Sequence, residues 1–145
     1  MRGRFCLGVL LFAGILLPIT SCSTGPSLTS IVISPSSVTV TLVPSGIPQG
    51  YNQFTAIGYY THPGHAAQTQ DITNQVTWTS SGTQVATICT STSSSTCTPG
   101  LATATGYSSN GVAWTGITNI TASMSGFGGV IVSNEATFTV TAPTT

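Results

Sequence analysis

Two histidines and one carboxylate lie within a short stretch of this chain and are the first candidates for chemistry. His62 and His65 flank a Pro-Gly pair, and Asp71 follows them. A Pro-Gly turn can bring two imidazoles together, and a nearby carboxylate is a third potential ligand. A stable zinc site, however, needs three or four ligands held in a defined geometry. Because solvated histidines are the default for such a turn, we expect no metal site and no cofactor here.

The same residues are too few for an active site. Asp71 and Glu135 are the only acidic side chains in the chain, and a glycosidase needs two carboxylates in one shaped cleft. A Ser-His-Asp set can be assembled on paper from one of the many serines, His62 or His65, and Asp71. The sequence has no Gly-x-Ser-x-Gly turn that would present the nucleophile. We therefore predict that the protein has no catalytic residues and is not an enzyme.

The chain has very few charged residues, and this excludes further classes of function. The two basic residues are Arg2 and Arg4, and no lysine or arginine follows them. Binding to nucleic acid needs cations that displace counterions from phosphate, so no nucleic-acid partner is expected. A basic patch that attracts anionic lipid headgroups is missing for the same reason. The chain is nevertheless 40% hydrophobic, which is unlike the low hydrophobicity and high net charge of disordered segments.

The N-terminal residues have the organisation of a secretory signal peptide. Basic residues precede an apolar run over 5–17, and small residues lead to Cys22. The run is short for a membrane span, which needs about 20 residues, although a retained membrane anchor is the alternative. Ile19-Thr20-Ser21-Cys22 resembles the bacterial lipobox. The resemblance implies cleavage after Ser21 and a lipid anchor on the Cys22 thiol.

This interpretation divides the chain into a signal peptide over 1–21, the lipidated Cys22 with a short linker to residue 27, and a domain over 28–142. It also predicts a location in the bacterial cell envelope. Many lipoproteins kept in the inner membrane have aspartate after the lipidated cysteine, whereas this chain has Ser23. The outer membrane or the cell surface is therefore favoured, with the membrane as a partner through the lipid.

Two cysteines remain for a disulfide. Cys6 is lost with the signal peptide and Cys22 carries lipid, which leaves Cys89 and Cys97 in an oxidising compartment. The segment between them consists of serine and threonine. We predict that the two are bridged. The rival interpretation, a two-cysteine metal site, lacks further ligands nearby.

The elements that hold these residues are predicted to be short β-strands. In the stretch 75–80, Val76 and Trp78 alternate with Thr77 and Thr79, which is the period of a half-buried strand. We expect Trp78 to pack in the core of a β-sandwich. The same alternation places Phe54, Ala56 and Gly58 on one face, and Ile120, Ala122 and Met124 on another. A first strand broken at Pro35 is expected to pair with one sheet before the break and with the other after it. About seven such strands and no helical period predict an all-β, Greek-key sandwich.

An ordered set of segments resembles the bacterial Ig-like group 2 domain. The segments are 28–40, 54–56, 76–81, 85–88, 100–106, 120–122 and 137–140. The resemblance implies an Ig-like sandwich used as a spacer or adhesion module on surface proteins. The chain departs from the pattern in its longer segments at 89–97 and 107–115.

The second of these segments is the candidate binding loop. It contains Tyr107 and Trp114, and loops at the ends of a sandwich often carry binding. Flat aromatic side chains beside hydroxyl groups suit stacking on sugars, but the same side chains can also cover the open end of the core. We therefore expect a lipid-anchored surface module with a structural or adhesive role. The alternative is a carbohydrate-binding lipoprotein, so a cell-surface protein or a glycan is the expected partner.

Overall fold

The computed structural model describes residues 25–43, 50–90, 97–107, 111–126 and 128–143. Strands are the only regular elements in these ranges, and no helix there is long and apolar enough to cross a membrane. The strands are β1 (Ser27–Ser34), β2 (Ser37–Thr41), β3 (Tyr51–Gln53), β4 (Thr55–Thr61), β5 (Gln68–Asp71), β6 (Thr77–Ser80), β7 (Ala86–Ile88), β8 (Leu101–Ala104), β9 (Gly116–Gly126), β10 (Gly129–Val132) and β11 (Ala136–Thr141). The predicted all-β fold is confirmed.

One layer of the sandwich is built on the stretch that contains β3 and β4. β4 pairs with β1 and β5, while β3 pairs with β8, which pairs in turn with β7. Only Phe54 separates β3 from β4, and its backbone N–H donates to the Gly100 carbonyl at 2.9 Å. The two three-stranded sheets are therefore continuous along this stretch and form a single layer.

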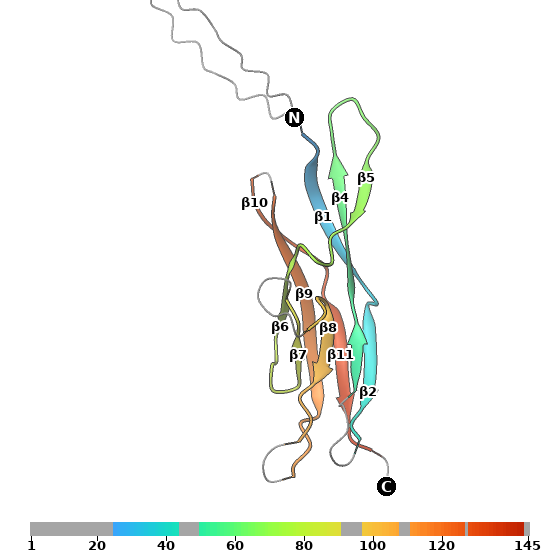
Figure 1. Ribbon diagram of the computed structural model, residues 1–145, viewed down its shortest axis with the longest axis vertical. Helices are drawn as coiled ribbons and strands as arrows, with labels where there is room; N and C mark the ends of the chain where they lie inside the picture. Colours follow the sequence, from blue (N-terminus) through green and yellow to red (C-terminus); the bar gives the residue numbers. More distant parts are fainter. Residues whose placement is uncertain (1–24, 44–49, 91–96, 108–110, 127, 144–145) are drawn as a thin grey trace, which may run out of the picture.

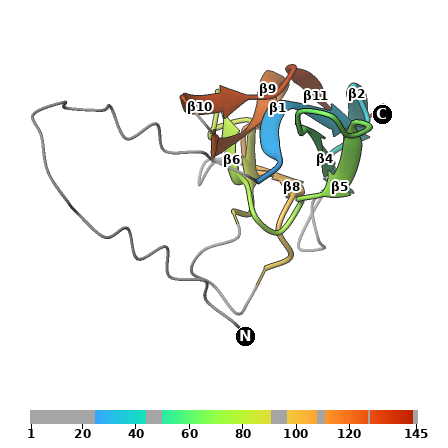
Figure 2. The same ribbon diagram turned by 90° about the horizontal axis from the view of Figure 1, so that it is seen from above.

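The other layer is built on β9, the longest strand. β6 lies along one edge of β9, and β10 and β11 follow one another along the opposite edge. The break between β10 and β11 falls at residues 133–135, where the Ser133 hydroxyl accepts from the Ala122 N–H. Seen from above, β2, β9, β10 and β11 lie in one layer and β4, β5 and β8 in the other (Figure 2).

The first strand changes layers at proline, as predicted. β1 pairs antiparallel with β4, whereas β2 pairs parallel with β11 on the other layer. The cis Ser34–Pro35 bond lies between them, and Pro35 has no N–H to donate to a ladder. The resulting order is β1-β4-β8-β7 in one layer and β2-β11-β9-β6 in the other, which is the strand order of an immunoglobulin-like sandwich.

Trp78 lies in the core between the layers. Its side chain is 4% exposed, and the rings of Phe54 and Phe138, both fully buried, complete the aromatic centre of the core. The Trp78 indole donates to the Thr73 carbonyl at 3.0 Å, so its one polar atom is satisfied. Val76 and Ile120 are also fully buried, while Thr77 and Thr79 face solvent. The predicted inward face of the 75–80 stretch is confirmed.

One strand has no signal in the sequence. Residues 68–71, which follow the histidine turn, form β5, which pairs antiparallel with β4. All four β5 side chains are exposed, so the strand has no inward apolar face and no alternation that a pattern could detect. Backbone pairing with β4 holds it, and side-chain burial contributes little.

Candidate functional site

The histidine turn forms the tip of the β4–β5 hairpin. The His65 N–H donates to the His62 carbonyl at 3.1 Å, and the two ring centroids lie 4.5 Å apart in an edge-to-face arrangement. The Pro-Gly turn thus brings the imidazoles together. Asp71 stands at the far end of β5, opposite Ile57. No group of three or more His, Cys, Asp or Glu side chains that could hold a metal occurs within the described ranges.

Asp71 closes a local turn after β5. Its carboxylate accepts the Thr73 N–H at 2.9 Å, and the Thr73 side-chain oxygen accepts the Ala56 N–H at 2.9 Å. Hydrogen bonds from the Thr73 side chain and then from its backbone lower the pKa of Asp71 below its ordinary value of 3.8. The structure therefore gives Asp71 a role in holding β5 to the segment that leads into β6.

The lowered pKa of Asp71 predicts a small acid-sensitive contribution to stability. A carboxylate whose pKa is lowered by folding stabilises the protein above its unfolded-state pKa, and the contribution is lost as the pH falls through the folded-state value. In Asp71→Asn the amide oxygen can still accept the Thr73 N–H, but it carries no charge. We expect the wild type to be slightly more stable than Asp71→Asn at pH 7 and equally stable well below pH 4, because the site is exposed to solvent. Urea unfolding at both pH values measures this, and an equal difference at both would contradict it.

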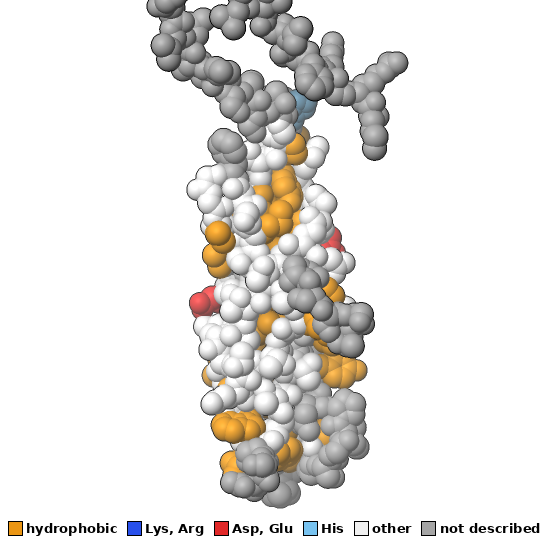
Figure 3. Space-filling model, turned by 60° about the vertical axis from the view of Figure 1, so that its left-hand side comes forward, with side chains coloured by type: hydrophobic (Ala, Val, Ile, Leu, Met, Phe, Trp, Pro, Cys, Tyr) orange, Lys and Arg blue, Asp and Glu red, His pale blue; other side chains and the backbone are white. Residues whose placement is uncertain are grey.

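The two acidic residues do not share a cleft. Asp71 belongs to the β4–β5 layer, whereas Glu135 lies between β10 and β11 and accepts from the Asn119 amide at 2.7 Å. Figure 3 shows the acidic side chains on opposite flanks of the molecule. Paired acid and base roles would need the two carboxylates within about 10 Å across a substrate.

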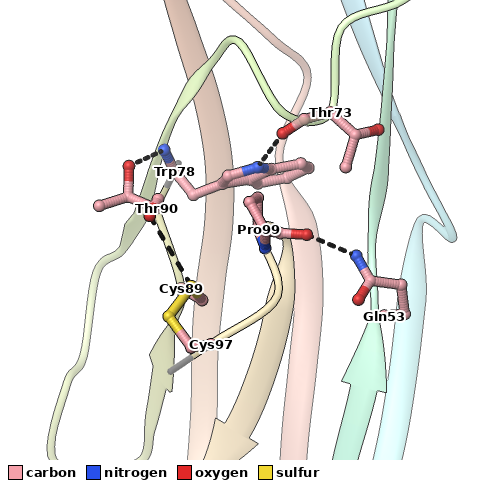
Figure 4. Close-up of a disulfide and its surroundings, with 7 residues drawn as sticks. All are labelled: Gln53, Thr73, Trp78, Cys89, Thr90, Cys97 and Pro99. Atoms are coloured by element: carbon pink, nitrogen blue, oxygen red, sulfur yellow. Dashed lines mark hydrogen bonds between the residues drawn. A yellow bond between two sulfur atoms is a disulfide. The ribbon is translucent and has the colours of Figure 1, made fainter. Parts of the chain in front are cut away.

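The predicted disulfide between Cys89 and Cys97 is present, with a Cα–Cα distance of 6.0 Å. It lies beside the core tryptophan (Figure 4). The Thr90 hydroxyl oxygen accepts the backbone N–H of Trp78 at 3.3 Å on one side of the bridge. On the other side, the Gln53 side chain donates to the Pro99 carbonyl at 2.7 Å. The bridged segment is therefore fixed at both ends to the two layers.

Gly100 allows this close packing. Its φ is +79°, and a Cβ there would lie 3.2 Å from Trp78 Cζ2 and would clash with the Phe54 carbonyl oxygen. Only glycine satisfies both the backbone conformation and the space. The segment that follows the disulfide can thus cross directly over the tryptophan ring.

The candidate binding loop does not present its two aromatic side chains together. Tyr107 forms an antiparallel bridge with Ala113, and both pack against the core. Residues directly opposite in an antiparallel pair point to the same side, and successive residues point to opposite sides. Trp114 therefore faces away from Tyr107, and its side chain is 37% exposed.

Trp114 instead belongs to a group of exposed apolar side chains at one end of the sandwich. In Figure 1 this is the lower end, where β2 ends, where β3 and β9 begin, and where β11 ends. We call it the distal pole, defined by Val43, Tyr51, Val112, Trp114 and Ile117. Of these, the sequence analysis named only Trp114. Val112 lies in the same loop, and Val43, Tyr51 and Ile117 lie at or beside strand ends that come together through pairing.

Cys22 and the whole segment 1–24 lie outside the described residues, so the lipidation site stays a prediction. Comparison of the chain with protein-family models found no matching family, and comparison with curated proteins found no match.

Proposed function

We propose that this protein is a non-catalytic, lipid-anchored module of the bacterial cell surface, with a structural or adhesive role. Its N-terminal residues resemble a lipoprotein signal, and its strand segments resemble the bacterial Ig-like group 2 domain. The observation that carries the proposal is the position of the two ends. β1 begins at one pole of the elongated sandwich and β11 ends at the other (Figure 1).

This arrangement suits a spacer. The stretch that contains β3 and β4 runs over residues 51–61, and at about 3.3 Å per residue it spans roughly 35 Å. A lipid at Cys22 would fix the pole where β1 begins, and the distal pole would then project from the membrane by about that length. The exposed side chains of Trp114, Val112 and Ile117 would be presented outward, where a partner can reach them.

Removal of the lipidated cysteine tests the anchor. We expect the wild-type chain, expressed in a bacterial host, to partition into the detergent phase, and Cys22→Ser to lose this partitioning. Each acyl CH₂ buried in the membrane contributes about 0.8 kcal/mol, so losing two or more chains abolishes stable binding. Cys6→Ser is the matched control, because that residue leaves with the signal peptide.

Two outcomes would change the proposal, one from the anchor experiment and one from a glycan array. If the wild-type protein partitions into the detergent phase but its mass shows residues 1–21 still attached and no lipid, these residues are a retained membrane anchor and the lipid is not needed. If the wild-type protein binds sugars on a glycan array and Trp114→Ala does not, carbohydrate binding replaces the purely structural or adhesive role.

A further inference from the structure

The pole where β1 begins is hollowed. Three adjacent pockets of about 210, 430 and 370 Å³ open there, and each includes at least one residue of 26–28. One lies against the histidine turn, one between β1 and the end of β9, and one between β1 and β10. Among the residues that the structure describes, nothing closes the two layers at this end.

The lining of this pole is uncharged and largely apolar. We call it the proximal pole, defined by Pro26, Tyr60, His62, Met124, Val130 and Ile131. Val130 is 68% exposed, although its side chain is a branched aliphatic one. The acidic residues are elsewhere, since Asp71 is at the opposite end of β5 and Glu135 follows β10. Covering this pole would therefore bury no carboxylate.

The length of chain before the proximal pole identifies what covers it. Pro26 is four positions after Cys22, and a fully extended chain advances at most about 3.6 Å per residue, or roughly 14 Å in all. This inference rests on the proposed lipid at Cys22. With the acyl chains in the membrane, the proximal pole cannot lie farther than that from the lipid attachment, so the bilayer interface is its nearest neighbour.

We propose that the proximal pole rests in the headgroup region of the bilayer and holds the domain upright on it. The pole has one amphipathic side chain of the kind that favours this region, Tyr60, with its polar hydroxyl and apolar ring. Met124 lines the same pocket as Tyr60, and Val130 lines another pocket of the same pole. It has no lysine or arginine, so the contact depends on apolar burial and needs no anionic lipid. The lipid thus fixes the domain in place, and the pole fixes its orientation.

A pair of matched label sites tests this contact. Val130 and Val112 are 68% and 65% exposed and lie at opposite poles. In the mature lipoprotein, Cys22 is acylated and Cys89 and Cys97 are bonded, so Val130→Cys or Val112→Cys supplies the single free thiol. Each variant is labelled with an environment-sensitive fluorophore and reconstituted into phosphatidylcholine vesicles. At position 130 we expect the emission of the fluorophore to shift to the blue on the vesicles and to be quenched by spin-labelled lipid. At position 112 we expect the emission to be quenched by aqueous iodide.

Several outcomes would overturn the inference, and they are distinguishable. If both labels are quenched by iodide alone in protein whose mass shows the lipid, the pole stands in water and only the anchor is retained. If spin-labelled lipid quenches both labels, the domain lies flat on the membrane. If Val130→Cys forms disulfide-linked dimers in detergent and Val112→Cys does not, a second copy covers the pole. A protein without lipid would refute the proposed function itself. An unfolding curve that matches the wild type shows that each variant is folded.

Discussion

Replacing Trp78 by alanine is expected to lower the free energy of unfolding by about 3–5 kcal/mol, as for other large aromatic side chains in a packed core. The indole fills the space between Phe54 and the segment at Gly100, and its removal leaves a cavity lined by both layers. The Thr73 carbonyl also loses its donor, which leaves a buried polar atom unsatisfied and is included in this range. Total stabilities of single domains are about 5–15 kcal/mol, so the loss is large.

The measurement is urea unfolding at neutral pH, with Trp114→Ala as the matched control. The control removes the same side chain from a site that is 37% exposed, and it should change stability by much less. If Trp78→Ala does not fold, Trp78→Phe keeps most of the volume and removes the hydrogen bond to Thr73, with an expected loss of about 1–3 kcal/mol. Equal losses in Trp78→Ala and Trp114→Ala would show that Trp78 is not central to the fold.

Removing the disulfide is the second large effect that we expect. The Cys89→Ser/Cys97→Ser double variant should lose about 2–3 kcal/mol. The bridge closes a short loop with a sequence separation of 8, and the chain-entropy model gives about 2.6 kcal/mol for nine residues. The backbone beside the bridge is held independently of it, because the Cys89 N–H donates to the Leu101 carbonyl at 3.0 Å and the Gly100 N–H donates to the Cys89 carbonyl at 2.9 Å. The folded structure should therefore persist without the bridge.

A reductant separates this effect from packing changes caused by serine. Dithiothreitol should lower the unfolding midpoint of the wild type to that of the double variant and leave the double variant unchanged. If the reductant has no effect on the wild type, the bridge contributes nothing to stability. If the double variant is far less stable than the reduced wild type, the substituted side chains are the cause.

Much of the sandwich could be predicted because apolar and polar residues alternate along its strands. Val76, Trp78, Ile120 and Phe138 each stand at inward positions with threonine or serine neighbours, and all four are buried. The change of layer at Pro35 was also predictable, since proline ends one ladder and the alternation resumes after it. The disulfide followed from the small number of cysteines that an oxidised mature chain would have available.

Other features depend on contacts between distant segments and had no local signal. Thr118 is an example. It lies on the same face of β9 as Ile120 and Ala122, so its burial at 1% exposure follows the alternation. Its partners do not follow from the pattern: the hydroxyl accepts the Gly82 N–H at 2.8 Å and bonds the Ser80 hydroxyl at 2.9 Å. These partners lie on β6 and the turn after it. A sequence pattern does not show that a buried hydroxyl is needed there.

The candidate loop shows the same limitation. Tyr107 and Trp114 are both aromatic and close in sequence, which favoured a shared binding surface. Because Tyr107 pairs with Ala113, the side chains of Tyr107 and Trp114 point to opposite sides. The amino-acid composition of the loop does not predict this pairing. The two poles likewise became visible only when strand ends from both layers were placed together.

The intact mass of the mature protein, extracted from bacterial membranes, tests the central proposal most directly. Trypsin is of little use here, since no lysine or arginine follows Arg4, but mass spectrometry of the whole chain needs no cleavage. We predict a polypeptide that begins at Cys22, carries a diacylglycerol and usually a further acyl chain, and is lighter by two hydrogens for the Cys89–Cys97 bridge. A mass equal to the unprocessed chain, or to a processed chain with a free Cys22 thiol, would contradict the lipid-anchored module.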